Sequence, residues 1–248
     1  MLDEPVRKSV WAQGQFERRR QLTYIVEFAG RASSGKSFFS QRVCERLKQQ
    51  GFQVDYNKRC PNNLRTTLRF LPQFVKALFM AVRCRPASLT KFFYIWRLLT
   101  RTQVMLLLLK RNPGIHILDE GLFHKFKQIR RESRKNPSVA NRLPLSEVWH
   151  NGLPACDALV IIDPDVETVQ ANRVRRGRRA KENIDSGILV KNIAAYRRDA
   201  EYLQGQFQHF NYIIVPNRYD TDIEAQVDQI VEFILTQASS PCVLRRVP

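Results

Sequence analysis

The sequence predicts an α/β fold in which helices cover a parallel β-sheet. Five short apolar runs of strand length recur along the 248 residues, and segments with helical spacing lie between them. The first run leads into GRASSGKS at residues 30–37, which matches G-x-x-x-x-G-K-[ST], a loop that joins a strand to a helix and binds phosphate. With 44% hydrophobic residues, the chain has the composition of a globular protein.

The strand and the helix around this loop are both clear in the sequence. Residues 22–28 are apolar, β-branched or aromatic apart from one glutamate, as in a buried parallel strand. Residues 38–50 have helical spacing, and Gly51 follows them as a helix stop. An ordinary surface turn before a helix is the alternative interpretation of the loop, and this strand–loop–helix context argues against it.

The residue types within the loop explain how it would hold a phosphate chain. Gly30 and Gly35 permit the backbone dihedrals and the close approach that the wrapping requires. Lys36 can reach the outer phosphates, and the Ser37 hydroxyl is placed to bind Mg²⁺. We therefore expect the nucleotide to contact the whole loop: Gly30, Arg31, Ala32, Ser33, Ser34, Gly35, Lys36 and Ser37.

Positive charge is concentrated in the middle of the chain. The net charge is +18, and between Asp55 and Asp119 there are twelve lysines and arginines but no acidic residue. This interval follows a second predicted strand at 52–56 and the loop at 57–63. It predicts an anionic ligand, which could be a phosphorylated substrate, an acidic lipid or a nucleic acid.

Residues 64–111 have the pattern of two helices with a break near Pro86. Lys76, Arg97 and Arg101 interrupt the apolar runs, so neither helix is expected to span a bilayer. Two interpretations remain open. The helices can pack on the core with a solvated basic face, or they can lie on an acidic membrane or cradle an apolar acceptor.

The third predicted strand, at 114–120, ends in Asp119 and Glu120. In enzymes with a phosphate-binding loop, an acid at such a strand end lies beside Mg²⁺ and the reacting phosphoryl group. Asp119 is the first candidate for binding Mg²⁺ or for deprotonating an acceptor hydroxyl, and Glu120 is the second. Alternatively, one or both cap the predicted helix at 121–131.

An arginine cluster follows the fourth predicted strand, at 158–163, and the helix opened by Pro164 and Asp165. Such a cluster can close over a nucleotide and neutralise the transferring phosphoryl group, or it can be a solvated basic helix end. A helix at 187–208, a strand at 210–215 and a helix at 223–235 complete the pattern. The cluster consists of Arg173, Arg175, Arg176, Arg178 and Arg179.

These elements predict one domain at 21–237, with a helical insertion at 64–111 and an arginine lid at 173–183. A basic lead-in (1–20) and a short tail (238–248) flank it. The five cysteines form no C-x-x-C pair, which indicates reduced thiols, and the N-terminus lacks the apolar core of a signal peptide. We therefore expect a cytoplasmic protein. The four histidines show no metal-ligand spacing.

Several segments together resemble the thymidylate kinase-like branch of the nucleoside and nucleotide kinases, over residues 21–236. The resemblance is carried by EFAGRASSGKS, NKRCPNN, ILDEG, CDALVIIDPDVETVQANRVRRGRR and NYIIVPN. It implies a three-layer P-loop NTPase fold with a five-stranded parallel sheet in the order 2-3-1-4-5, and it implies ATP and Mg²⁺ as cofactors.

The resemblance also implies a role for individual residues. Ser37 and Asp119 would hold Mg²⁺, and Asp119 and Arg59 would contact the acceptor. The catalytic set would be Lys36, Asp119, Arg173 and Arg176, and Glu120, a candidate from its place at the strand end rather than from the resemblance, completes it. The remaining nucleotide contacts would come from Arg175, Arg178, Arg179 and Asn217, the last beside the adenine ring.

One departure bears on the acceptor. The family has Asp-Arg at the end of the third strand, where this chain has Asp119-Glu120. A second carboxylate would repel a phosphorylated acceptor, which favours a hydroxyl acceptor such as a sugar, an envelope saccharide or a lipid-linked glycan. We predict an ATP-dependent phosphotransferase. The alternatives are an ATPase or switch docked by the basic helices on a membrane or partner, and a nucleic-acid phosphoryl-transfer enzyme.

Overall fold

A computed structural model describes the sheet and the helices around it. The described residues are 23–57, 113–119, 156–177, 186–206, 210–220 and 222–238, with short pieces of 75–100 and 121–127. Several predictions fall outside them. These are the lead-in at 1–20, the tail beyond residue 238, most of the loop at 57–63 with Arg59, and Glu120, Arg178 and Arg179.

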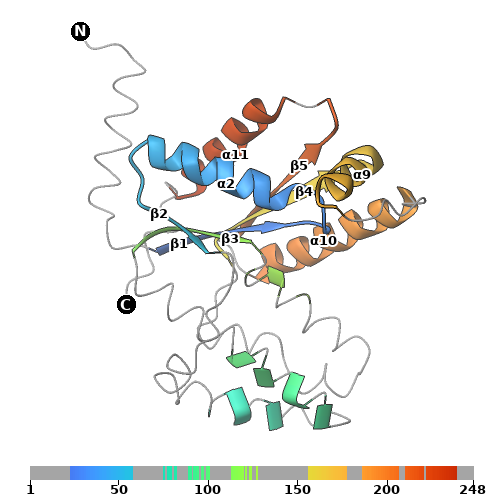
Figure 1. Ribbon diagram of the computed structural model, residues 1–248. Helices are drawn as coiled ribbons and strands as arrows, with labels where there is room; N and C mark the ends of the chain where they lie inside the picture. Colours follow the sequence, from blue (N-terminus) through green and yellow to red (C-terminus); the bar gives the residue numbers. More distant parts are fainter. Residues whose placement is uncertain are drawn as a thin grey trace.

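Five parallel strands form one sheet in the order β2-β3-β1-β4-β5, which confirms the predicted order (Figure 1). The central strand β1 pairs with β3 on one side and with β4 on the other. The strands are β1 (Thr23–Ala29), β2 (Val54–Asn57), β3 (Gly114–Asp119), β4 (Ala158–Pro164) and β5 (Asn211–Asn217).

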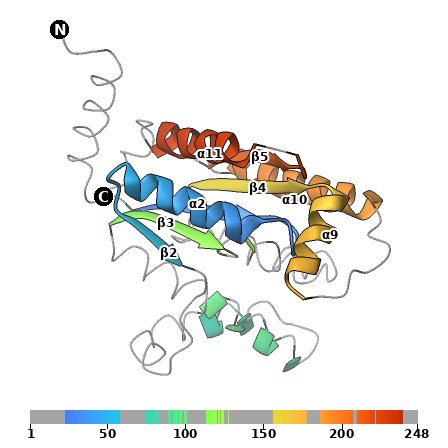
Figure 2. The same cartoon turned by 45° about the horizontal axis from the view of Figure 1, so that its top comes forward.

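Helices cover both faces of this sheet (Figure 2). One face carries α2 (Lys36–Gln49) and α11 (Ile223–Ala238), and the other carries α10 (Ser186–Gln206). A further helix, α9 (Val166–Arg175), follows β4. Among the described residues, no helix is both long and apolar enough to cross a membrane.

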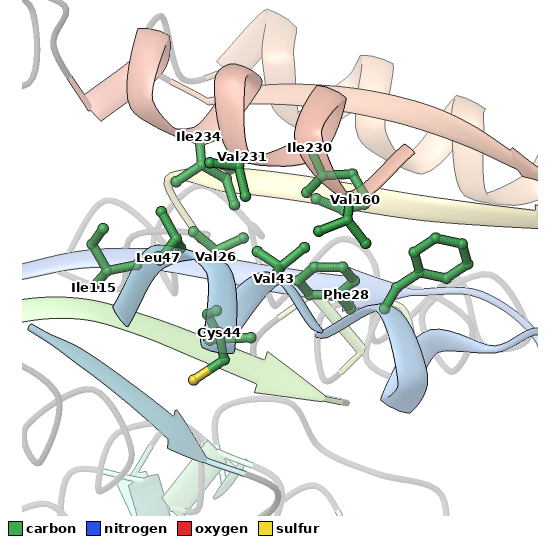
Figure 3. Close-up of a cluster of buried hydrophobic side chains, with 14 of the residues drawn as sticks. Val26, Phe28, Val43, Cys44, Leu47, Ile115, Val160, Ile230, Val231 and Ile234 are labelled. Atoms are coloured by element: carbon green, nitrogen blue, oxygen red, sulfur yellow. The ribbon is translucent and has the colours of Figure 1, made fainter. Parts of the chain in front are cut away.

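The core consists of two clusters, one on each face of the sheet. Side chains of β1 alternate between them, because neighbouring residues of a strand point to opposite faces. Val26 and Phe28 join the cluster under α2 and α11, and Ile25 and Ala29 join the cluster under α10. Figure 3 shows the first cluster, in which Val43 and Leu47 of α2 meet side chains of α11 over the sheet.

Element ends differ from the predicted ones where backbone hydrogen bonds continue or interrupt a pattern. The second strand begins at Val54 rather than at residue 52, because the amide of Phe52 donates to the carbonyl of Leu47 and closes the turn after α2. The last strand runs on to Asn217, because Pro216 and Asn217 still pair with the end of β4.

Candidate active site

The loop at residues 30–37 leaves the carboxyl end of β1 and enters α2, as the sequence predicts. Asp119 lies at the end of the neighbouring strand β3, where it is in register with Phe28 of β1. The carboxyl edge of a parallel sheet is where such folds bind ligands. The loop and the predicted acidic residue therefore meet at one place.

Both loop glycines are required by the backbone. Gly30 has a φ of +150° and Gly35 a φ of +90°, dihedrals that residues with a side chain rarely adopt. A Cβ at Gly30 would lie 2.9 Å from the carbonyl oxygen of Ile162, and one at Gly35 would lie 2.7 Å from Nδ2 of Asn217. The loop is thus packed closely from outside as well as tightly turned.

Three side chains from different elements hold the outer side of this loop by its carbonyl groups. The hydroxyl of Tyr196 donates to Gly30 at 3.1 Å, Nδ2 of Asn172 donates to Ser33 at 3.1 Å, and Nδ2 of Asn217 donates to Ser34 at 2.9 Å. None of these contacts is visible in the linear pattern, because the partners lie 139 to 183 residues away.

These contacts orient the loop amides. In a planar trans peptide the carbonyl and the following N–H point in opposite directions. Holding the carbonyls of Gly30 and Ser34 from outside therefore turns the amides of Arg31 and Gly35 toward the interior of the loop. Inward amides of this kind form an anion-binding concavity.

Other polar atoms of the loop are buried without a hydrogen-bond partner among the described residues. They are the hydroxyl oxygens of Ser33 and Ser34 and one terminal nitrogen of Arg31. A buried polar group left unpaired costs about 1–3 kcal/mol. A ligand rich in acceptor oxygens would remove that cost, and this fits the phosphate groups for which the loop is predicted.

Lys36 and Ser37 begin α2 at the inner end of the loop. The Lys36 ammonium donates to the carbonyl of Arg31 at 3.2 Å, so the side chain turns back along the loop although the residue is only 8% exposed. The N-terminal end of α2 adds its own partial positive charge at this point. A lysine held here can exchange a carbonyl oxygen for a phosphate oxygen.

Ser37 and Asp119 meet directly. The serine hydroxyl donates to Oδ2 of Asp119 at 2.5 Å, and the other carboxylate oxygen, Oδ1, is buried with no hydrogen-bond partner among the described residues. A hydroxyl and a carboxylate oxygen are ligands that Mg²⁺ accepts. The pair therefore fits a magnesium ion that would take further oxygens from water and substrate phosphates.

No group of three or more His, Cys, Asp or Glu side chains that could hold a metal ion occurs in the described part of the chain. Mg²⁺ is usually bound through one or two carboxylates plus phosphates rather than by a protein cage.

Glu27 is a site residue that the sequence analysis missed. It lies within β1, is fully buried, and accepts hydrogen bonds from the amides of Gly121, Phe123 and His124 at 2.9, 2.6 and 3.0 Å. These amides follow Asp119 closely, so the carboxylate fixes the backbone that leaves β3. The available signal was a single acid inside an apolar strand, because a buried charge requires partners.

The predicted arginine cluster begins beside the loop. Arg173 directly follows Asn172 in α9, and Arg175 and Arg176 are exposed at the end of this helix. The start of α9 is capped by Asp165, whose carboxylate accepts from the amide of Thr168 at 2.7 Å. The helix is thereby fixed at its first turn, and its basic residues directly follow Asn172, which contacts the loop.

Asn217 lies against the loop, where its amide contacts Ser34. The ring of Tyr196, whose hydroxyl contacts Gly30, stacks with Phe123 at a centroid distance of 6.2 Å, and the Lys127 ammonium lies 3.0 Å from the centre of the Tyr196 ring. Burial lowers the pKa of Lys127 to about 8, and the nearby Asp199 opposes this shift only in part.

No protein-family model and no curated protein matches the sequence. Three similar solved structures are of deoxyadenosine kinase from M. mycoides. With dATP bound, the identity is 17% and the TM-score 0.47, over 85% of this chain and 98% of that chain. With dCTP bound, the identity is 16% and the TM-score 0.44. With the products dCMP and a flexible dCDP bound, the identity is 15% and the TM-score 0.42. Each of these two alignments covers 86% of this chain and 99% of that chain.

At TM-scores below 0.5, these likenesses establish neither an acceptor nor an activity for this chain. Its fold is established by its own features. These are the strand order β2-β3-β1-β4-β5 and a phosphate-binding loop that joins the central strand to α2.

Proposed function

We propose that this protein is an ATP-dependent phosphotransferase of the cytoplasm that transfers the terminal phosphoryl group of ATP to a hydroxyl acceptor. The observation that carries the proposal is the hydrogen bond between Ser37 and Asp119 at the mouth of the loop. It brings a metal-binding hydroxyl and a strand-end carboxylate to the place where the outer phosphates would lie.

The residues of the loop, of β3 and of α9 would each have a separate role in phosphoryl transfer. Loop amides and the Lys36 ammonium would bind the phosphate oxygens, and Ser37 and Asp119 would hold Mg²⁺, which neutralises charge on the transferring group when bound. Arg173 and Arg176 would approach the same charge from α9. This meets the main requirement of a loose transition state, which is positioning together with electrostatic stabilisation.

The acceptor is proposed only as a class. A carboxylate beside the acceptor can accept the proton of an attacking hydroxyl, whereas it repels a phosphate. Asp119 and its neighbour Glu120 therefore favour a neutral hydroxyl compound, such as a nucleoside or a sugar, including a glycan. Arg59 would contact the acceptor if the acceptor carries negative charge.

Transfer from radiolabelled ATP with Mg²⁺ to a panel of deoxynucleosides, nucleoside monophosphates, sugars, lipid-linked glycans and an oligonucleotide tests this proposal. We expect one acceptor class to be labelled, and Asp119→Asn to lower kcat about a hundredfold. Asp163→Asn is the matched control, because Asp163 also lies at a strand end but is held by Arg218 at 3.3 Å.

Two outcomes would count against the phosphotransferase, and a third would count against the role of Asp119. Hydrolysis of ATP with no labelled acceptor would favour the ATPase or switch. Labelling of an oligonucleotide alone would favour the nucleic-acid enzyme. Equal activity of Asp119→Asn and Asp163→Asn would remove Asp119 from the site.

We propose a second role for the described pieces of 75–100, which is docking on an anionic membrane. In these pieces Ala77, Ala81 and Leu99 are buried in the core and Phe92 and Trp96 pack against it, whereas seven other apolar or aromatic side chains are exposed. Between residues 75 and 101 there are six basic residues and no acid, so two copies of this surface would repel each other. The exposed side chains are Val75, Leu78, Phe79, Val82, Leu89, Phe93 and Tyr94.

Sedimentation with vesicles tests this docking. We expect binding to vesicles with anionic lipid but not to neutral ones, weakened by Phe79→Ser with Phe93→Ser and abolished by charge reversal at Lys76, Arg97 and Arg101. Tyr219→Ser, which changes a 73% exposed aromatic residue after β5, is the control. Self-association without vesicle binding would instead identify a contact between two copies of the chain.

A further inference from the structure

A cavity of about 510 Å³ lies between the turn that joins β4 to α9 and the first half of α10, elements that lie next to one another in Figure 1. Pockets that bind small molecules have volumes of about 300–1,000 Å³. The cavity is lined by the end of β4, the first turn of α9, one side of α10 and Arg218 after β5. None of the loop residues 30–37 lines it, and neither does Asp119.

The cavity lies on a side of α10 that does not face the phosphate-binding loop. Tyr196 is the residue of this helix that contacts the loop. Successive residues of a helix are about 100° apart, so Arg197 and Ala194 point about 100° and 160° away from Tyr196 around the helix axis. Both of them line the cavity, whereas Asn172 and Asn217, which also contact the loop, do not. A molecule in the cavity would therefore not replace the contacts that hold the loop.

The inner surface of the cavity is apolar. Pro164 and Leu189 are buried there, and Val166 and Ile193 are half-buried. Val190 also lines the cavity and is 69% exposed. A ligand with an apolar body would cover these side chains and remove them from water, which stabilises the complex in proportion to the area covered.

The two carboxylates that line the cavity are already bound by groups of the protein. Asp163 accepts from the guanidinium of Arg218 at 3.3 Å, and the same guanidinium donates to the Asp163 carbonyl at 2.9 Å. Asp165 accepts from the amides of Thr168 and Tyr219 at 2.7 and 3.4 Å. These carboxylates therefore do not favour a cationic ligand.

The remaining charged groups of the cavity are the guanidinium groups of Arg197 and Arg198. Both are exposed, and neither has an ion pair or a side-chain hydrogen bond within the described ranges. An exposed arginine alone is an ordinary surface residue, but here two of them lie beside an apolar cavity. A guanidinium binds carboxylate and phosphate groups through parallel hydrogen bonds. The charge and the apolar lining together favour an anion with an apolar body.

We propose that this cavity is a second binding site, separate from the phosphate-binding loop, for a small organic anion with an aromatic or branched apolar body and a carboxylate or phosphate group. The body would lie on Pro164, Leu189 and Ile193, and Arg197 and Arg198 would bind the anionic group. The site goes beyond the proposed function, since none of these residues belongs to the proposed machinery of phosphoryl transfer.

Titration with the fluorescent probe anilinonaphthalene sulfonate, an aromatic anion, tests this site. Phenylnaphthylamine has the same rings without the sulfonate and is the control ligand. We expect the anion to bind at least about tenfold more tightly than the neutral probe, because only the anion gains hydrogen bonds to the guanidinium groups. Hydrogen exchange followed by mass spectrometry should show protection by the anion in peptides that cover 163–166 and 186–198.

Variants assign the probe to the cavity. In Arg197→Gln with Arg198→Gln we expect the affinity for the anion to fall about tenfold or more and the affinity for the neutral probe to stay unchanged. Ala194→Trp fills the cavity from an exposed position and should prevent protection of both peptides. Lys191→Gln, an exposed basic residue of α10 that does not line the cavity, is the control. Urea unfolding checks that each variant is folded.

Competition identifies the anionic group and tests whether the site is separate. Displacement of the probe by phenyl phosphate or by phenylacetate supports the site and tells a phosphate ligand from a carboxylate ligand. Equal affinity of the wild type and the double arginine variant, or protection confined to peptides of 75–100, would overturn it. Displacement by ATP and Mg²⁺ in the wild type but not in Lys36→Ala would assign the cavity to the nucleotide site and would also overturn it. Binding of the probe as expected supports the site even if no acceptor is phosphorylated.

Discussion

Gly35 lies in the phosphate-binding loop and Gly51 in the turn after α2. Comparing them separates two reasons for a glycine, which are the backbone dihedral and the lack of space for a side chain. Their φ angles are similar, +90° and +85°, and both lie in the region that favours glycine. A Cβ at Gly51 would meet nothing within 4 Å, whereas one at Gly35 would lie 2.7 Å from the Asn217 amide. The two positions therefore share the backbone strain but not the steric clash.

Substitution of each glycine by alanine tests this difference. We expect Gly51→Ala to cost about 1 kcal/mol of unfolding free energy and to retain ATP binding, since only the left-handed backbone is penalised. Gly35→Ala should also break the contact between Asn217 and Ser34 and lose ATP binding. Urea unfolding and nucleotide titration measure both effects, and equal affinities of the two variants would contradict the expectation.

Lys127 predicts a pH dependence of stability. Its pKa is lowered to about 8 in the fold, from the ordinary value of 10.5, because burial penalises the charged form. Below pH 8 both the folded and the unfolded chain carry this proton, and the cost of burying the charge is fully present. Between pH 8 and 10.5 only the unfolded chain keeps the proton, so the contribution of Lys127 to stability rises with pH.

The difference in unfolding free energy between the wild type and Lys127→Met should therefore be constant from pH 6 to 7.5 and should shift in favour of the wild type toward pH 10.5. Lys191→Met, at an exposed position of α10, is the control for the substitution itself. Denaturant titrations over this pH range measure the effect. A flat difference for Lys127→Met would show that the lysine is not buried as described.

At the scale of elements, Glu27 joins the central strand to the segment that leaves β3. Its carboxylate is fully buried and accepts three backbone hydrogen bonds, so it replaces the solvent that these amides would otherwise contact. Hydrogen bonds to a charged group contribute about 1.5–3 kcal/mol each to the unfolding free energy. Leaving a buried donor or acceptor unpaired costs more free energy than a formed hydrogen bond contributes. The segment after Asp119 depends on this one side chain.

Glu27→Gln tests that dependence. The amide has only one acceptor oxygen and brings an NH₂ group against a backbone donor, so we expect a loss of about 2–4 kcal/mol in unfolding free energy. The control is Glu224→Gln, which removes an exposed ion pair with Arg46 at 2.6 Å and should cost less than about 1 kcal/mol. Urea unfolding compares the two variants, and similar losses would contradict the role of Glu27.

At the scale of the whole molecule, ligand binding should stabilise the fold through the loop. A ligand that binds only the folded chain adds about 2.7 kcal/mol at a concentration of one hundred times its Kd. We expect ATP with Mg²⁺ to raise Tm, and chelation of Mg²⁺ with EDTA to reduce the increase. In Asp119→Asn, which lacks the carboxylate that contacts Ser37, the increase should no longer depend on Mg²⁺. Thermal unfolding measures each case, and an EDTA effect of unchanged size in Asp119→Asn would contradict the proposed metal ligand.

The elements around the phosphate-binding loop could be predicted because their patterns are local. The apolar period of β1, the stop at Gly51 and the match at residues 30–37 each depend on neighbouring residues only. The family resemblance added the strand order, which the structure confirms. The ends of the elements were less predictable. Pairing with β4 extends β5 to Asn217, and because a turn follows α2, β2 begins later in the sequence than predicted.

By itself the sequence determined the fold class, the position of the loop, and Ser37 and Asp119 as candidate metal ligands. Only the tertiary structure decided what holds the loop in shape: Tyr196, Asn172 and Asn217 from outside it, and Glu27 beneath the segment after β3. The physical reason is distance along the chain. A periodic pattern reports which face of an element is buried, but a hydrogen bond between residues more than 90 positions apart leaves no periodic trace.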